Sequence, residues 1–291
     1  MYPSRFRYEA PTSVDEAIAL LDANADAKVL AGGQSLIPMM KLRFASPAVL
    51  VDINNIGGLD HHRADSDGTF HIGALCRHAD LEKSTILADH QPVLAAAAPL
   101  VADPIVRTRG TFVGSVCHAD PQGDWASCMV ALDGSIIAQG PNGRRSINVK
   151  EFVSGPFQTV LARNELAVEA VIPPAVGRRA GGYLKLERRV GDFATAGVAL
   201  ALDLKGDVVA NAGIGLTGVG GQTIDASDAA QALIGTRLEP EAVDVASQLA
   251  ASASSPRSDH RGSADYKRHI ISTFVARIIA GVQREEMQVA S

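Results

Sequence analysis

The sequence predicts an α+β protein that ends in an antiparallel sheet covered by helices. Three observations predict this fold. Residues 13–53 pass from a helix through a strand and a glycine loop to a second strand. Three strand patterns lie between residues 183 and 216, and the last two are joined as a hairpin by the turn Lys205-Gly206-Asp207. Helical patterns then fill most of residues 227–280.

The first helix is predicted by a capping box, in which Ser13 is the N-cap and Glu16 the third helical residue. Strands are predicted next at residues 28–31, 49–53, 70–75, 135–138 and 166–172, and helices at residues 80–87, 92–101 and 125–132. Residues 103–124 show no regular period and are predicted to be irregular. Irregular stretches of this length inside a compact domain are usually functional.

The C-terminal part is predicted to begin after residues 173–182, which are rich in proline, glycine and arginine. Strands are expected at residues 183–188, 197–204 and 208–216, followed by helices at 227–234, 240–253 and 264–280. A small antiparallel sheet with helices on one face is the natural outcome.

Composition excludes several classes of protein. The chain has 291 residues, 46% of them hydrophobic and 20% charged, as in an ordinary soluble globular protein. Its net charge is −5, with no long basic run, so nucleic acid is not an expected partner. The longest apolar run, residues 92–102, contains prolines and is too short to span a membrane. The N-terminus has no apolar signal-peptide core, so a cytoplasmic location is expected.

The three cysteines, Cys76, Cys117 and Cys128, form no CxxC pair. An iron–sulfur cluster normally needs four thiolates, so this chain alone is not expected to hold one. No metal site is predicted, and the cysteines are expected to be small core residues in a reducing compartment.

Two glycine-rich segments carry the functional signal. The first, AGGQSLIPMMKLR at residues 31–43, follows a strand directly. Its glycines allow a sharp bend, and its backbone N–H groups and the Ser35 hydroxyl can surround a diphosphate. A Gly-Gly turn after a strand is also a common plain turn, so this segment alone is a weak signal.

The second segment, RTRGTFVGSVCHADPQGD at residues 107–124, concentrates hydroxyls, glycines and carboxylates. Thr111 and Ser115 can donate to phosphate oxygens, Gly114 permits close backbone approach, and Asp124 can accept from a ribose or ribitol hydroxyl. Polar loops are common, so this segment is also not specific by itself.

Together these segments closely resemble the FAD-binding medium subunits of the molybdenum hydroxylases. Two further elements of that family pattern are present in the expected order. They are LKLERRVGDFA at residues 184–194 and SADYKRH at residues 263–269. The resemblance spans nearly the whole chain. It implies a two-subdomain FAD-binding domain of the vanillyl-alcohol-oxidase-like (PCMH) type, over residues 1–55 and 56–176. It also implies a C-terminal domain over residues 177–291, of the kind found in CO dehydrogenase flavoproteins.

The resemblance implies non-covalent FAD. The residues that would hold it are Val29, Leu30, Ala31, Gly32, Gly33, Gln34, Ser35, Leu36, Val106, Gly110, Thr111, Gly114, Ser115, His118, Gly123, Asp124, Leu166, Lys185 and Phe193. The first loop would hold the diphosphate, and residues 106–118 would form a second wall near the diphosphate and adenosine. Asp124 would accept from a cofactor hydroxyl, and Lys185 would favour an anionic reduced flavin. Phe193 would lie against the isoalloxazine ring or be a plain core residue.

The sequence departs from the family pattern in both loops, and in the second loop Phe112-Val113-Gly114-Ser115 replaces the usual Ile-Gly-Gly-Asn. Gln34 stands where histidine is frequent, Val113 where glycine is usual, and Ser115 where asparagine is usual. Valine does not adopt a positive φ without strain, as glycine could. FAD binding is expected to survive these departures, with an altered loop shape or affinity.

The resemblance implies an oxidoreductase subunit that transfers electrons. A large partner would carry the molybdopterin cofactor, and a small partner would carry [2Fe–2S] clusters. FAD would pass the electrons to an external acceptor, in a dimer of heterotrimers. The residues leave open whether the oxidised substrate is carbon monoxide, an aldehyde or an N-heterocycle. They equally leave open whether the acceptor is NAD, oxygen, quinone or a carrier.

Two other interpretations remain beside this one. The chain is a flavin-binding scaffold without redox turnover, if Val113 disables the site, or a self-contained flavin oxidase, if it turns over alone. A third pattern, GxGxxG at residues 213–218, is not followed by a helix and is not interpreted as a dinucleotide fingerprint.

Overall fold

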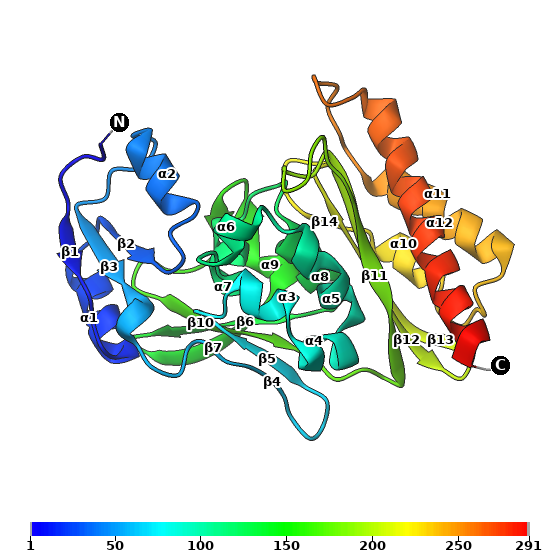
Figure 1. Cartoon of the computed structure of the whole chain (residues 1–291), viewed down its shortest axis with the longest axis horizontal. Coiled ribbons are helices and arrows are strands. Elements are labelled where there is room, and N and C mark those ends of the chain that lie inside the picture. The colour runs from blue at the N-terminus through cyan, green and yellow to red at the C-terminus, as the bar shows by residue number, and fades with distance from the viewer. Residues whose placement is uncertain (1, 290–291) are drawn as a thin grey trace.

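A computed structural model describes residues 2–289 and shows three larger sheets arranged in chain order, together with a two-stranded sheet of β8 and β9 (Figure 1). The N-terminal sheet is parallel, in the order β1-β3-β2, the middle sheet is antiparallel, in the order β4-β5-β10-β6-β7, and the C-terminal sheet is antiparallel, in the order β11-β12-β13-β14. The α+β prediction is confirmed. No helix within the described residues combines the length and apolar character that crossing a bilayer requires.

The N-terminal and middle parts contain most of the short elements. They are β1 (Arg7–Glu9), α1 (Val14–Ala23), β2 (Ala27–Leu30), α2 (Leu36–Lys41), β3 (Val49–Asp52), the 3₁₀ turn η1 (Ile53–Asn55), β4 (His62–Ala64), β5 (Phe70–Gly73), α3 (His78–Glu82), α4 (Thr85–His90), α5 (Pro92–Ala97), the 3₁₀ turn η2 (Ala98–Leu100), α6 (Pro104–Arg107), α7 (Phe112–His118), α8 (Asp124–Ala131), β6 (Ser135–Gly140), β7 (Gly143–Asn148), α9 (Val149–Phe152), β8 (Val153–Gly155), β9 (Gln158–Thr159) and β10 (Leu166–Ile172).

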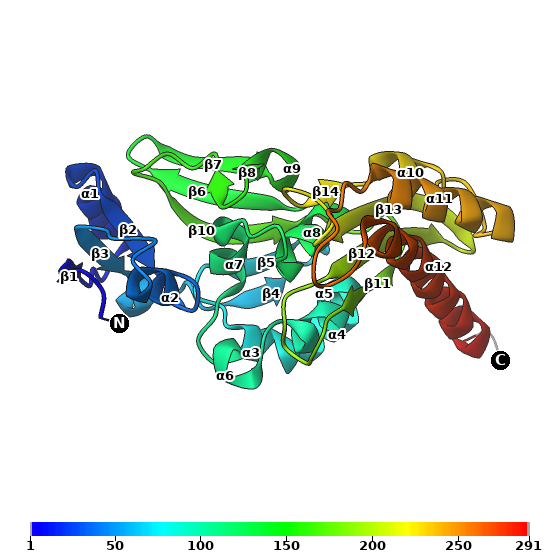
Figure 2. The ribbon, with the colours of Figure 1, turned by 90° about the horizontal axis from the view of Figure 1, so that it is seen from above.

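The C-terminal part has fewer and longer elements. They are β11 (Arg178–Leu186), β12 (Ala196–Lys205), β13 (Val208–Thr217), β14 (Ile224–Asp225), α10 (Ser227–Gln231), α11 (Pro240–Ala253) and α12 (Ala264–Val289). Figure 2 shows α10, α11 and α12 together on one side of this sheet.

Several predicted boundaries were wrong. The helix expected at 80–87 is broken, because Ser84 caps a new helix by accepting from the Leu87 N–H. Residues 103–124 are not irregular, since they contain α6 and α7. The strand expected at residues 183–188 begins earlier, because β11 begins at Arg178. Sequence patterns also missed the edge strands β1, β4 and β7, which are short and carry mainly polar or exposed side chains.

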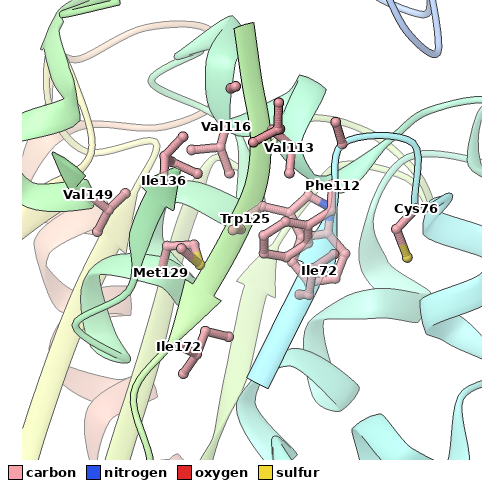
Figure 3. Close-up of a cluster of buried hydrophobic side chains, with 14 of the residues drawn as sticks. Ile72, Cys76, Phe112, Val113, Val116, Trp125, Met129, Ile136, Val149 and Ile172 are labelled. Atoms are coloured by element: carbon pink, nitrogen blue, oxygen red, sulfur yellow. The ribbon is translucent and has the colours of Figure 1, made fainter. Parts of the chain in front are cut away.

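The hydrophobic core forms two clusters. The first covers the N-terminal and middle sheets and is centred on Trp125, whose ring lies 4.7 Å from that of Phe112 (Figure 3). The second lies between the C-terminal sheet and its helices. Strand β12 contributes to both clusters, because Ala199 and Ala201 face the first while Leu200 and Leu202 face the second.

The GxGxxG pattern has a packing role. Gly213 and Gly215 lie inside strand β13, and a Cβ on either would come within 2.0 Å of a backbone oxygen of α8. Helix α8 therefore rests directly on the backbone of the strand, which only glycine allows at these two positions.

Candidate FAD-binding site

The two glycine-rich segments meet in the structure. A Cβ on Gly32 would lie 2.3 Å from the Arg109 carbonyl oxygen and 2.8 Å from the Gly110 Cα. The first loop follows β2, at the end of the N-terminal sheet, and the second leads into α7 of the middle part. Glycine at position 32 therefore allows the two parts to touch backbone to backbone.

A cavity of about 390 Å³ opens beside this contact. It is lined by Leu30, Ala31, Gly32, Gly33, Gln34, Ile37, Pro38, Lys41 and Arg109. Its size lies within the range of about 300 to 1,000 Å³ that is usual for ligand pockets. Lys41 and Arg109 are the charged residues of this lining, so the cavity suits an anionic group.

The backbone of the first loop offers free donors. Gly33 has a φ of +74°, which turns the loop back toward helix α2. Within residues 2–289, the N–H groups of residues 32–36 have no hydrogen-bond acceptor. A cradle of successive free N–H groups beside two cations fits a diphosphate.

The second wall is the start of helix α7. Thr111 is its N-cap, and the Thr111 hydroxyl accepts from the Gly114 N–H at 3.2 Å. A Cβ on Gly114 would lie 2.5 Å from that hydroxyl oxygen and 4.0 Å from the Ala31 Cβ. Gly114 therefore allows the capped turn to form and the first loop to approach it.

Val113 does not strain the second loop. It is the second residue of α7, its φ is not among the positive values, and its side chain is buried in the first core cluster beside Phe112 (Figure 3). The positive φ that valine would resist is therefore not required at this position. A helical turn needs no glycine there, and valine fills the core instead.

A polar network that sequence reasoning missed ties the two loops together. The Arg77 guanidinium donates to the Arg109 carbonyl oxygen and to the Asn54 side-chain oxygen. The Asn54 amide donates to the Ala31 carbonyl oxygen at 2.9 Å. Lys41 and Arg109, which line the cavity, were also absent from the predicted site residues, although both lie inside the family motifs.

Asp124 and Lys185 are brought together in a buried cluster. The Tyr183 hydroxyl donates to Asp124 at 2.6 Å, and the Lys185 ammonium lies 3.4 Å from the same carboxylate and 3.2 Å from that of Glu187. Burial raises the pKa of Asp124, while Lys185 and Tyr183 oppose the rise. The Lys185 side chain is 1% exposed.

Phe193 lies close to this cluster and is not a core residue. The Lys185 ammonium donates to the Asp192 carbonyl oxygen at 3.2 Å, and the next residue, Phe193, is 52% exposed. The exposed ring is free to contact a ligand, which removes the interpretation of Phe193 as plain core.

The remaining predicted residues lie outside the lining of the cavity. Leu166 is buried in the first core cluster, and the His118 ring lies 5.1 Å from that of Phe157. Burial lowers the pKa of His118. The others are Val29, Ser35, Leu36, Val106, Gly110, Thr111, Gly114, Ser115, Gly123, Asp124, Lys185 and Phe193.

Two family models match the chain. The FAD binding domain in molybdopterin dehydrogenase matches residues 4–175, and the CO dehydrogenase flavoprotein C-terminal domain matches residues 182–282.

Similar proteins match almost end to end. The carbon monoxide dehydrogenase medium chain of Hydrogenophaga pseudoflava is 41% identical over 96% of this chain and 97% of its own length. The nicotine 6-hydroxylase medium subunit of Paenarthrobacter nicotinovorans is 36% identical over 94% of this chain and 95% of its own. A solved carbon monoxide dehydrogenase from Hydrogenophaga pseudoflava superposes with a TM-score of 0.92 at 42% identity, over 98% of this chain and 99% of that one.

Proposed function

This chain belongs to the FAD-binding medium subunits of the molybdenum hydroxylases, and we propose on that premise that its two glycine-rich loops hold the diphosphate of non-covalent FAD. The observation that carries the proposal is their contact at Gly32, beside the cavity that Lys41 and Arg109 line. Free backbone N–H groups and two cations supply the donors and the charge that a diphosphate requires.

The cluster around Lys185 suits the redox-active end of the cofactor. FAD bound there would supply a redox centre that collects electrons arriving one at a time from iron–sulfur clusters and passes them to an external acceptor. Lys185 would place an ammonium near such a ring and favour negative charge on it, although the two carboxylates that hold the ammonium, Asp124 and Glu187, offset part of its charge. Phe193 supplies an exposed aromatic face that excludes water from such a ring.

In the proposed complex the chain is an electron-transfer subunit. Electrons reach FAD from [2Fe–2S] clusters of a small partner subunit, after substrate oxidation at the molybdopterin cofactor of a large one. The absence of a membrane-crossing helix among the described residues is compatible with the proposed cytoplasmic location. The proposed assembly is a dimer of heterotrimers.

The proposal is tested by FAD uptake with a matched pair of glycine variants. The purified chain is incubated with FAD and desalted, and its absorbance near ~450 nm is measured before and after acid release. Gly33 and Gly206 both have positive φ values, +74° and +63°, so alanine imposes a similar backbone strain at each. Gly33→Ala is expected to raise the Kd for FAD at least about tenfold, whereas Gly206→Ala leaves it unchanged.

Other results would support the other interpretations. A folded wild-type chain that stays colourless after incubation with FAD contradicts the proposal and favours a scaffold. Equal losses in the two variants place the loops outside the binding site. Steady turnover of a substrate by the chain alone favours a self-contained oxidase.

A further inference from the structure

The family motif at residues 263–269 lies in the C-terminal part. None of its residues belongs to the proposed FAD site described above. It begins helix α12, where the Ser263 hydroxyl accepts from the Tyr266 N–H at 3.1 Å. Its lysine, Lys267, is 3% exposed, although its neighbours Asp265, Tyr266 and His269 are exposed. A buried lysine is costly unless its ammonium is fully paired, so the partners of Lys267 indicate what the motif does.

Lys267 holds the segment that precedes its own helix. Its ammonium donates to the Arg257 carbonyl oxygen at 2.9 Å and to the Asp259 carboxylate at 2.7 Å. The other oxygen of Asp259 accepts from the Arg261 N–H at 2.8 Å. Asp259 also exchanges two backbone hydrogen bonds with Gly262, which closes a tight turn. The conformation of residues 257–262, which we call the strap, therefore depends on the Lys267–Asp259 pair.

One of the two arginines of the strap, Arg261, contacts the residues next to the buried cluster around Lys185. Arg261 donates to the Phe193 carbonyl oxygen at 2.8 Å and approaches the Asp192 carboxylate at 3.3 Å. The Arg261 side chain is only 11% exposed. Figures 1 and 2 show the segment between α11 and α12 at the same end of the C-terminal sheet as the turn from β11 to β12, which carries Phe193.

Asp192 and Phe193 are thus held from two sides. From inside, Lys185 donates to the Asp192 carbonyl oxygen, and from outside Arg261 binds the Asp192 side chain and the Phe193 backbone. The Phe193 ring itself remains exposed. The contacts fix the backbone of this residue while leaving its aromatic face available.

We propose that Arg261, oriented by the Lys267–Asp259 pair, is a positioning residue that holds the Phe193 ring against the bound flavin. The inference rests on the proposed function, because it requires FAD at the loops. In this proposal the C-terminal motif helps to shape the flavin site, in addition to stabilising the fold.

The test compares Arg261→Ala, Phe193→Ala and the double variant in the full chain loaded with FAD. The readouts are the shape of the flavin band near ~450 nm and the Kd for FAD, with the unfolding midpoint as a check of folding. Removing the ring exposes the isoalloxazine to water, so Phe193→Ala is expected to blur the band and raise Kd about tenfold. Arg261→Ala is expected to blur the band and raise the Kd in the same way. The double variant should be no worse than Phe193→Ala alone, because each substitution removes the same contact between the Phe193 ring and the flavin.

Two further variants separate positioning from stability. Arg261→Lys keeps one donor and should restore part of the band shape and affinity. Arg268→Ala removes an exposed arginine paired with Asp265 in the same motif, and should leave both unchanged.

Three results would overturn the inference. They are a normal band and Kd in Arg261→Ala, additive losses in the double variant, or no effect of Phe193→Ala. A wild-type chain that takes up no FAD would remove the proposed function and this inference together. Normal FAD uptake with an inert Arg261→Ala variant would remove the inference alone.

Discussion

His78 connects the hydrophobic core to the second glycine-rich loop. Its backbone N–H donates to the Gly110 carbonyl oxygen, and its Nδ1 lies 3.0 Å from the Trp125 indole nitrogen. An indole N–H only donates, so Nδ1 must be unprotonated. Burial, with smaller effects from Arg107 and Arg77, lowers the pKa of His78 from 6.5 to about 4. The neutral ring is therefore part of the native structure at neutral pH.

This shift predicts a loss of stability in mild acid. The unfolded chain binds a proton at His78 below pH 6.5, while the folded chain resists it until about pH 4. The free energy of unfolding should therefore fall as the pH falls between these values, with a slope of at most about 1.4 kcal/mol per pH unit from this residue. Urea unfolding at several pH values measures the slope.

The variant His78→Asn isolates this residue from other groups that titrate in the same range. Its side-chain oxygen can still accept from Trp125, but it does not titrate. The slope between pH 4 and 6.5 should be smaller in this variant than in the wild type. Equal slopes would show that His78 does not contribute.

At the residue scale, the sequence pointed to the glycines that meet at the candidate site but not to the polar network behind them. Gly32, Gly33 and Gly114 belong to strings of residues that form a recognisable family pattern. Arg77 and Asn54, by contrast, lie outside those strings, and only the fold brings them to the loops. Side-chain partners distant in sequence leave no local pattern, so they could not be predicted from one sequence.

Helices α6 and α7 show why short capped helices are hard to predict. Each spans fewer than eight residues, so neither has room for a repeating apolar pattern. Each begins at a residue type that favours the N-cap, because Asp103 and Thr111 both accept from a backbone N–H three residues on. The longer helix α11, residues 240–253, was predicted with its observed bounds.

The cap of α7 predicts a variant that separates stability from cofactor binding. Thr111→Ala removes the hydroxyl that accepts from Gly114, and should lower the free energy of unfolding by about 1 kcal/mol. It should also weaken FAD binding, because it loosens the second wall. Titration with FAD and urea unfolding measure the two effects.

Ser13 provides the matched control, since its hydroxyl caps α1 by accepting from the Glu16 N–H. Ser13→Ala should cost a similar free energy of unfolding and leave the Kd for FAD unchanged. Thr111→Ser retains the capping hydroxyl and should behave nearly as the wild type. If both alanine variants weakened FAD binding equally, the effect at Thr111 would be one of general stability.

At the scale of the whole molecule, strand β12 couples the two core clusters. Nine of its ten residues, 196–204, are buried, because α8 covers one face and α12 the other. This explains the continuous apolar run that predicted the strand. The order of elements along the chain was predictable from such runs, whereas the contact of the two faces with different clusters was not.

The coupling predicts one cooperative unfolding transition. Leu202 belongs to the second cluster, and Trp125, the single tryptophan of the chain, belongs to the first. Leu202→Ala should cost about 2 to 5 kcal/mol. It should shift the midpoint measured by Trp125 fluorescence as much as the midpoint measured by far-UV circular dichroism.

The control is Leu249→Ala, at a position that is 37% exposed on α11, where a loss below about 1 kcal/mol is expected. A Trp125 midpoint that stays in place while the circular dichroism midpoint falls would show that the clusters unfold independently.

Burial of β12 on both faces also restricts which chimeras of two related subunits can fold. A chimera that joined residues 1–176 of this chain to the C-terminal part of a relative would preserve the linker, yet it would bring in a foreign Tyr183, Ala199 and Ala201 surface against α5 and α8. The side chains that must match therefore lie beyond the covalent joint. A chimera that folds should therefore keep the residues of this inner face from the parent that supplies residues 1–176. The outer face and the helices on it, α10, α11 and α12, can come together from the other parent.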